Sequence, residues 1–213
     1  MDHPNPHLIV PRVPGFAIGR DFDRAPWRRI RAVPLAPSSG EGKASKDSTV
    51  RLCWSETHLH AAFDCREAHL RCTYTRRDDP LYNEDVVELF LAPDVGEPCR
   101  YFELEFNALG TNFDATVLHP TPDGSARPKV DATWDCDGLE VVARIRERRW
   151  QVEAAIPFAG LGVPVPSPGD RWRGNAYRID YGPPDAYLAW SPTRTPRPNF
   201  HVPSRFGTLE FGR

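Results

Sequence analysis

Carboxylate side chains recur in two neighbouring segments of the sequence, and they are the residues with the clearest chemical potential. Glu88 lies inside the otherwise apolar run 86–91, and Glu103 and Glu105 alternate with apolar residues in the segment 101–107. Carboxylates accept hydrogen bonds from sugar hydroxyls, and nearby aromatic rings can stack on the apolar face of a pyranose. Pairs of carboxylates at set separations also hydrolyse glycosidic bonds. The pattern therefore points to a saccharide as ligand or, as the lesser alternative, as substrate.

Strand parity determines which of these side chains share a face. Successive side chains of a strand point to opposite sides of its sheet. In the segment 85–92, Val87 and Leu89 then point to the core, whereas Glu88 and Phe90 point the other way. In the segment 101–107, the face opposite the core holds Tyr101, Glu103, Glu105 and Asn107. If the two segments are antiparallel neighbours, all three glutamates lie on one sheet face.

Three like charges on one face repel one another, so a compensating group is expected. The candidates are Arg178 or Arg100 from elsewhere in the chain, a bound cation, or the hydroxyl donors of a ligand. An ordinary solvent-facing sheet is the alternative to a binding face.

The elements that position these residues are short strands. Period-two alternation predicts ten of them, at 49–54, 59–65, 85–92, 101–107, 111–118, 139–146, 150–156, 172–181, 186–190 and 206–211. Short connections predict three hairpins, around residues 55–57, 108–110 and 147–149. Segments 34–48, 119–130 and 160–170 are rich in Pro, Gly and Ser and are expected to be loops, and only 158–161 suggests a helical turn. We therefore predict an all-β, antiparallel two-sheet β-sandwich of about ten strands.

Length and composition are consistent with one domain over residues 1–213. The 23 prolines disfavour long helices, and a net charge of −2 gives no global field that would attract nucleic acid or an anionic membrane. The first residues lack the basic and apolar regions of a signal peptide, so the sequence as written predicts a cytoplasmic protein, or a secreted one if the start is misassigned. The five cysteines include no C-x-x-C pair, which favours reduced, mostly buried thiols.

Several short motifs follow one another in the order found in a known family. They are the run 19–27 (GRDFDRAPW), 81–91 (LYNEDVVELFL), 102–107 (FELEFN) with Gly110, 150–157 (WQVEAAIP), 169–175 (GDRWRGN), 189–192 (AWSP) and 199–209 (NFHVPSRFGTL). Along nearly its full length the chain resembles the carbohydrate-binding module family 9-like proteins, which are related to the DOMON-type β-sandwiches.

The resemblance implies a jelly-roll-like sandwich and, in the sugar-binding members, two aromatic rings that clamp a terminal sugar among carboxylate, amide and guanidinium groups. The first ring of the clamp falls on Tyr82 and the carboxylate on Glu88, whereas the arginine of sugar-binding members falls on Glu103. The second ring falls in the run 199–202, where the chain offers Phe200 and His201 in place of a tryptophan. The candidate ligand-binding residues are thus Tyr82, Glu88, Glu103, Glu105, Asn107, Trp190, Asn199, Phe200 and His201.

The resemblance also bears on other residues and on cofactors. Trp27, Trp150 and Trp172 match framework positions and are expected in the core. No cofactor is predicted, although calcium is structural in some relatives and hard oxygen ligands are available at Asp78, Asp79, Asn83, Glu84 and Asp85. The haem of DOMON relatives needs a methionine, and the chain's single methionine is Met1.

Three classes of function follow from these observations. The first is a non-catalytic protein that binds a small saccharide or a glycan end. The second is a structural or interaction domain that has lost sugar binding, and the third is a glycoside hydrolase with paired carboxylates. The sequence leaves open the sugar, any metal ligands and the oligomeric state.

Overall fold

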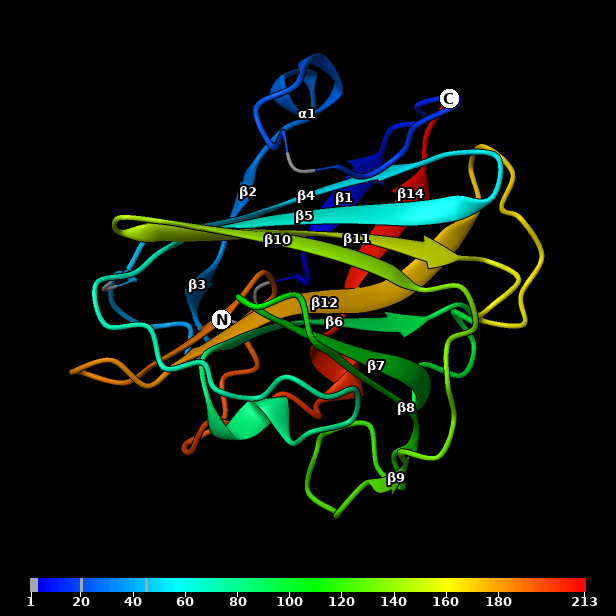
Figure 1. Cartoon of the computed structure of the whole chain (residues 1–213). Coiled ribbons are helices and arrows are strands. Elements are labelled where there is room, and N and C mark those ends of the chain that lie inside the picture. Colours follow the sequence, from blue (N-terminus) through cyan, green and yellow to red (C-terminus); the bar gives the residue numbers. More distant parts are fainter. Residues whose placement is uncertain (1–3, 20, 45) are drawn as a thin grey trace.

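The computed structural model describes residues 4–19, 21–44 and 46–213, and its strands form two stacked sheets (Figure 1). Arg20 of the first family motif and Ser45 of a predicted loop lie outside the described residues. Within the described part, the larger sheet has nine strands: β1 (His7–Val10), β3 (Ala36–Pro37), β6 (Val86–Ala92), β7 (Arg100–Asn107), β8 (Asn112–Leu118), β9 (Lys129–Asp131), β12 (Arg171–Asp180), β13 (Ala186–Ala189) and β14 (Gly207–Phe211). The smaller sheet has five: β2 (Val33–Pro34), β4 (Ser48–Trp54), β5 (His58–Arg66), β10 (Glu140–Arg146) and β11 (Arg149–Pro157).

The order of strands confirms the predicted antiparallel sandwich. The main path of the larger sheet is β1-β14-β12-β6-β7-β8-β9, with β13 and β3 attached beside β12, and the smaller sheet runs β10-β11-β5-β4-β2. All ten predicted strands are present, and the predicted hairpins β4–β5, β7–β8 and β10–β11 are antiparallel pairs. The pairing of β1 with β14 is parallel.

The elements that the sequence pattern missed are short. Strands β1, β2, β3 and β9 have two to four residues each, too few for alternation to register, and β2 and β3 both contain proline. Of these, β2, β3 and β9 lie inside or beside the segments 34–48 and 119–130 that were expected to be loops. In the described part of the chain the one α-helix is α1 (Ala25–Arg29), and the two 3-10 helices are η1 (Leu81–Asn83) and η2 (Pro203–Arg205). At the expected helical turn, 158–161, the backbone N–H of Leu161 donates to the Pro157 carbonyl at 3.1 Å, a single turn that does not continue as a helix.

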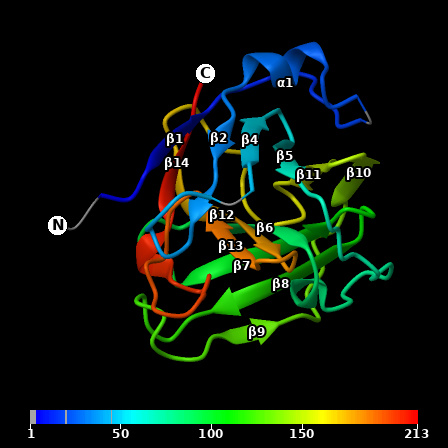
Figure 2. The ribbon, with the colours of Figure 1, turned by 90° about the vertical axis from the view of Figure 1, so that its left-hand side faces the viewer.

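The main core lies between the two sheets. Trp150, on the inner face of β11, and Trp172, on the inner face of β12, belong to it and are buried, as predicted. Trp27 is also buried, but it packs in a separate small cluster between α1 and the smaller sheet. Figure 2 shows α1 above that sheet and β9 at the opposite end of the molecule.

The outer face of the larger sheet carries a second core rather than a solvent-facing surface. Phe90, Tyr101, Tyr177 and Phe206 are buried there together with the loops that cover β6, β7 and β8 (Figure 1). The polar face of the segment 101–107 therefore lies beneath other parts of the chain, which corrects the expectation of an open sheet face. Burial makes each charged group on this face costly unless it has a partner.

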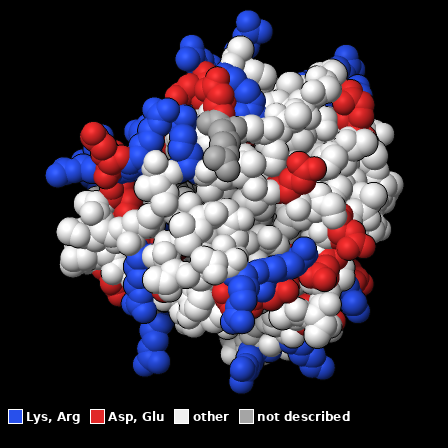
Figure 3. Space-filling view, in the orientation of Figure 1, with Lys and Arg blue, Asp and Glu red and all other residues white. Residues whose placement is uncertain are grey.

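The remaining surface agrees with the near-zero net charge. Acidic and basic side chains are both scattered over the face shown in Figure 3. The five cysteines are free thiols, and three of them are buried, as expected. The described residues include no helix with the length and apolar character needed to cross a bilayer.

Candidate functional site

Three glutamates meet on the outer face of the larger sheet. Strands β6 and β7 are antiparallel neighbours, as predicted, and their register sets Glu88 directly opposite Glu105 and Phe90 opposite Glu103. A carboxylate oxygen from each glutamate lies within 4.8 Å of those of the other two. The sheet thus brings Glu88 next to Glu103 and Glu105, which follow it by 15 and 17 residues in the sequence and alternate along β7.

These glutamates are deeply buried, with Glu88 3%, Glu103 6% and Glu105 0% exposed. Burial, and next the Glu103 carboxylate, raise the pKa of Glu88 well above its ordinary value. Burial raises the pKa of Glu103 to about 7, and burial together with Glu88 and Glu103 raises the pKa of Glu105. Neither buried carboxyl oxygen of Glu105 has a hydrogen bond of good geometry among the described residues, and the Tyr82 backbone N–H only partly opposes the rise of its pKa. The cluster therefore retains protons that isolated carboxylates would release at neutral pH.

The glutamates form the floor of a pocket of about 610 Å³. Its walls come from η1, β8, the end of β12, β13 and the loops before η2 and around β9. Seven of the nine predicted ligand-binding residues line it: Tyr82, Glu88, Glu103, Glu105, Asn199, Phe200 and His201. A cavity of this volume is within the range that holds small ligands.

Tyr82 lies on η1 at the rim of the pocket, and its side chain is 46% exposed. Its ring meets the edge of Phe113 on β8, with the centroids 6.1 Å apart and the planes at 87°. The hydroxyl of Tyr181 donates a hydrogen bond of 3.1 Å to the backbone carbonyl of Tyr82. The rim thus presents an aromatic surface held in place from two sides.

The opposite chain segment, residues 199–201, is anchored to the second core. The ring of Phe200 stacks on Tyr177 at 4.2 Å and 8°, and the Tyr177 hydroxyl donates to the Phe200 carbonyl. Nδ1 of His201 lies 2.7 Å from the Tyr101 hydroxyl, and burial lowers the pKa of His201 to about 4. The Asn199 amide donates to the Gly124 carbonyl at 3.3 Å. These contacts hold the segment in place through groups of the chain itself.

Two predicted residues lie outside this pocket. Asn107 is buried at the β7–β8 turn, where its amide donates to the Tyr74 carbonyl and its oxygen accepts from the backbone N–H groups of Leu109 and Thr111. Trp190 packs in the core between the sheets, and its ring covers Gly207 so closely that a Cβ there would lie 2.5 Å from it. Asn107 therefore stabilises a turn and Trp190 packs in the core, and neither lines the pocket.

The sequence analysis missed several pocket residues, chiefly Phe113, Tyr181 and Tyr187. Phe113 is the direct cross-strand partner of Glu105, and Tyr177 is that of Glu88. Parity along β12 then places Ile179 and Tyr181 on the same face as Tyr177. Extending strand parity from β6 and β7 to β8 and β12 is the signal that could have found them.

Neither predicted arginine neutralises the glutamates. Arg178 pairs with Val87 in the sheet, so its side chain points to the face opposite Glu88. Arg100 is exposed and pairs with Glu97. The nearest basic group is His201, whose Nε2 lies 3.9 Å from a Glu103 oxygen and which is neutral above its lowered pKa.

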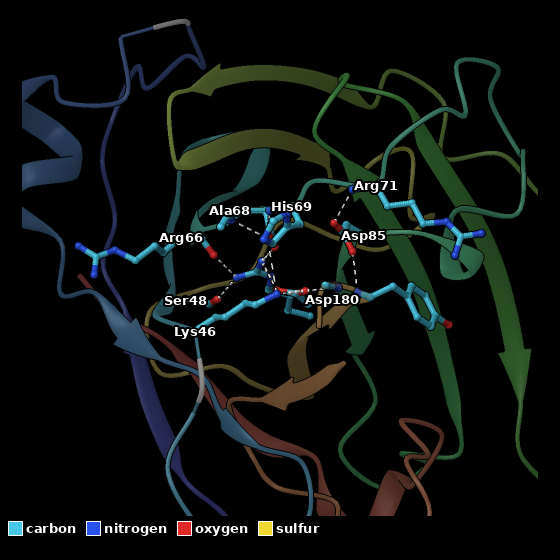
Figure 4. Close-up of polar contacts among 12 residues, drawn as sticks. Lys46, Ser48, Arg66, Ala68, His69, Arg71, Asp85 and Asp180 are labelled. Carbon is cyan, nitrogen blue, oxygen red and sulfur yellow. Dashed lines mark hydrogen bonds and ion pairs between the residues drawn. The ribbon is translucent and has the colours of Figure 1, made fainter. Parts of the chain in front are cut away.

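Arg178 instead belongs to a second polar cluster. Figure 4 labels Lys46, Ser48 and Asp180 of this cluster. The Arg178 guanidinium donates to Glu67 at 2.6 Å, to Asp180 at 2.5 Å, to the Ser48 hydroxyl and to the Arg66 carbonyl. Lys46 donates to Asp180 and lies 3.5 Å from Glu67. Two basic side chains therefore occupy the space between these carboxylates.

The five residues with oxygen ligands for calcium do not form one cluster. Asp85 groups with Glu67 and Asp180, whereas Asp78 groups with Asp114 and Asp135. Glu84 accepts hydrogen bonds from Thr73, Asp79 accepts from Arg76, and Asn83 lines the pocket. In the second group, Arg77 already pairs with Asp114 and Asp135. The chain segment 78–85 therefore spreads its oxygens over separate sites.

Solved structures share the fold of this chain over nearly its whole length. A protein from Bacteroides uniformis, provisionally assigned as carbohydrate-binding, has a TM-score of 0.79 at 22% identity and covers 98% of this chain and 100% of its own. A family 9 carbohydrate-binding module from Caldicellulosiruptor kristjanssonii, in complex with cellotriose, has a TM-score of 0.69 at 15% identity over 97% of this chain and 94% of its own. Its complex with glucose gives 0.68 at 16% identity, over 97% and 96%.

Sequence comparison gives a consistent result. An extracellular protein from Arthroderma benhamiae is 24% identical over 221 residues, covering 96% of this chain and 97% of its own. The sequence profile of carbohydrate-binding family 9 matches residues 21–211, from the segment before α1 to the end of β14. The chain therefore belongs to carbohydrate-binding family 9.

Proposed function

We propose that this protein binds the end of a small saccharide or glycan, without catalysis, in the pocket above Glu88, Glu103 and Glu105. The observation that carries the proposal is the pocket itself, where hydrogen-bonding carboxyl groups form the floor and aromatic rings form the rim. Hydroxyl groups of a sugar can bond to the floor while a pyranose face packs on Tyr82. Family membership, and the complexes of the Caldicellulosiruptor module with glucose and cellotriose, support the same ligand class.

The placement of the carboxyl groups favours binding over hydrolysis. A glycosidase needs two carboxyl groups that flank the scissile bond, one to protonate the leaving oxygen and one on the other side of the sugar. Glu88, Glu103 and Glu105 project from neighbouring positions of one sheet face. They would all contact the same side of a bound sugar, which suits recognition of its hydroxyl groups.

An extracellular location is part of the proposal. The Arthroderma relative, an extracellular protein, matches over almost the whole of both chains. The cytoplasmic expectation depended only on the first residues of the sequence as written. Glycans that such a pocket would bind are abundant outside cells, so an extracellular location fits the ligand class.

Calorimetric titration with glucose and cellotriose, with and without calcium, tests the proposal. We expect measurable binding by the unmodified protein and a loss of about tenfold in affinity, or about 1.4 kcal/mol, for Tyr82→Ala, because the rim loses its stacking surface. Leu109→Ala is the matched control, since Leu109, in the turn between β7 and β8, is similarly exposed (48%) but does not line the pocket. Absence of binding to both sugars and to a broad glycan array would instead support a structural domain that has lost its ligand.

A further inference from the structure

The floor of the pocket holds more carboxyl groups than recognition of a neutral sugar requires. Each of the three glutamates is more than nine-tenths buried, and their oxygens lie within 4.8 Å of one another. Glu105 is completely buried and lines the pocket, and neither of its oxygens has a hydrogen bond of good geometry in the described chain, although the Glu103 carboxyl and the Tyr82 backbone N–H lie close enough to act on its pKa. Burying three carboxyl groups beside so few hydrogen-bond donors costs stability, and donors from a ligand would offset that cost.

The protein itself provides no fixed positive charge for this floor within the described residues. The one basic group in ion-pair range is the neutral His201, and Arg178 lies on the other side of the sheet. Arg127 is exposed at the rim, where solvent screens its charge.

The walls of the pocket are suited to a positively charged ligand. Five aromatic side chains line it: Tyr82, Phe113, Tyr181, Tyr187 and Phe200. Aromatic rings attract cations through their negative faces. A primary ammonium group has three N–H donors, which matches the three carboxyl groups of the floor. Hydrogen bonds from an ammonium to carboxylates are charge-assisted and roughly twice as strong as neutral ones.

We propose that the pocket selects saccharides that carry a primary ammonium group, namely 2-amino-2-deoxy sugars and oligosaccharides that end in them. This inference rests on the proposed function and names its ligand class. The ammonium group lies on the floor formed by Glu88, Glu103 and Glu105, and the sugar ring lies between the aromatic walls. Ionisation of the floor accompanies binding, because the ammonium charge offsets the repulsion among the three carboxylates.

An amino sugar fits this floor better than a divalent metal ion does. Calcium takes six to eight oxygen ligands, many of them from backbone carbonyls and loops. Here the three carboxyl groups project from β6 and β7, whose paired backbone groups belong to the ladder between these strands. The surrounding aromatic rings supply no further metal ligands, whereas they do stabilise an organic cation.

Calorimetric titration at pH 6.5 and 0.15 M salt with glucosamine, glucose and N-acetylglucosamine tests the inference. N-acetylglucosamine has the same ring with a neutral amide, so it controls for the size of the 2-substituent. We expect glucosamine to bind at least tenfold more tightly than either neutral sugar. In the Glu105→Gln variant we expect the ratio of glucosamine affinity to glucose affinity to fall to about one. Glu97 is exposed and pairs with Arg100, so the Glu97→Gln variant should keep the ratio of the unmodified protein.

The results separate this inference from the proposed function. Equal affinity for glucose and glucosamine overturns the amino-sugar preference and leaves saccharide binding in place, whereas no binding of any sugar overturns both. Heat from calcium chloride alone that disappears in Glu105→Gln identifies a metal site and also overturns the inference. If Glu105→Gln does not give the circular dichroism spectrum of the folded protein, Glu103→Gln takes its place, and a retained glucosamine preference there counts against the proposal.

Discussion

At the residue scale, the structure changes the meaning of the glutamate inside the run 86–91. Parity correctly separates Glu88 from the core residues Val87 and Leu89, but the face that it joins is itself buried. Glu88, Glu103 and Glu105 are therefore ionisable groups in a second core, and their raised pKa values follow mainly from loss of water. A pocket floor of this kind binds best when a ligand restores the lost hydrogen bonds.

The raised pKa of Glu103 predicts a pH-dependent gain in stability for Glu103→Gln. The folded-state pKa, about 7, lies above the ordinary value of 4.5, so the contribution of Glu103 to stability is complete below about pH 4.5 and is lost as the pH rises through 7. Glutamine resembles the protonated acid and does not titrate. We expect little difference from the unmodified protein at pH 4.5 and a gain of up to about 3 kcal/mol in the free energy of unfolding at pH 8.

Urea unfolding at both pH values measures this difference, and Glu97→Gln is the control. The Glu97 side chain is largely exposed, so its replacement should change stability equally little at both pH values. An equal effect of Glu103→Gln at pH 4.5 and pH 8 would show that this carboxyl group titrates normally in the folded protein.

At the element scale, the pocket depends on loops that lie far apart in the sequence. The loop after β8 contacts the segment 199–202 at Gly124, which has a positive φ of 76°. A Cβ at this position would lie 2.7 Å from the His201 carbonyl oxygen and 2.9 Å from a Val202 methyl group. Gly124 thus allows the two loops to pack together beside the ligand pocket.

We expect Gly124→Ala to weaken saccharide binding by several-fold as the segment 199–202 shifts. The added methyl group must displace backbone, in addition to the cost of about 1–2 kcal/mol for a left-handed residue other than glycine. Gly42→Ala is a matched control, because Gly42 has a φ of 79° but nothing within 4 Å of its Cβ position. Calorimetric titration of both variants should show weaker binding for Gly124→Ala alone. Unchanged affinity in Gly124→Ala would show that the contact between the two loops does not contribute to saccharide binding.

At the scale of the whole molecule, a buried ionic cluster links the two sheets. Arg178 belongs to β12 of the larger sheet, whereas two of its hydrogen-bond acceptors, the Ser48 hydroxyl and the Arg66 carbonyl, belong to β4 and β5 of the smaller one. Burial raises the pKa of Asp180 in this cluster to about 6, although Lys46 and Arg178 oppose that effect. The cluster therefore holds its carboxylates by means of two fixed cations from the chain, unlike the floor of the pocket.

Removing Arg178 should destabilise the protein far more than removing an arginine at the start of the same strand. Arg178→Leu leaves Glu67 and Asp180 buried with Lys46 as their remaining cation, and breaking a buried ion pair in this way costs about 3–5 kcal/mol. We expect a fall of roughly 10 °C in the unfolding midpoint. Arg171→Leu should cost at most about 1 kcal/mol, because Arg171 is largely exposed and pairs with Glu210 at the surface. Differential scanning calorimetry compares the two, and similar midpoints would contradict a role for the cluster in joining the sheets.

The sequence by itself determined the fold class, ten of the strands and the three hairpins, because alternation and turn residues are local signals that survive folding. It also placed Tyr82, Glu88, Glu103, Glu105, Asn199, Phe200 and His201 among the candidates, and the structure brings these seven to one pocket. Only the tertiary structure decided that the glutamate face is covered and that the Arg178 side chain lies on the other side of the sheet. It also decided that Asn107 and Trp190 lie outside the pocket. Parity indicates on which side of its own strand a residue lies, whereas burial, ion pairing and the walls of a pocket depend on which distant segments cover that side.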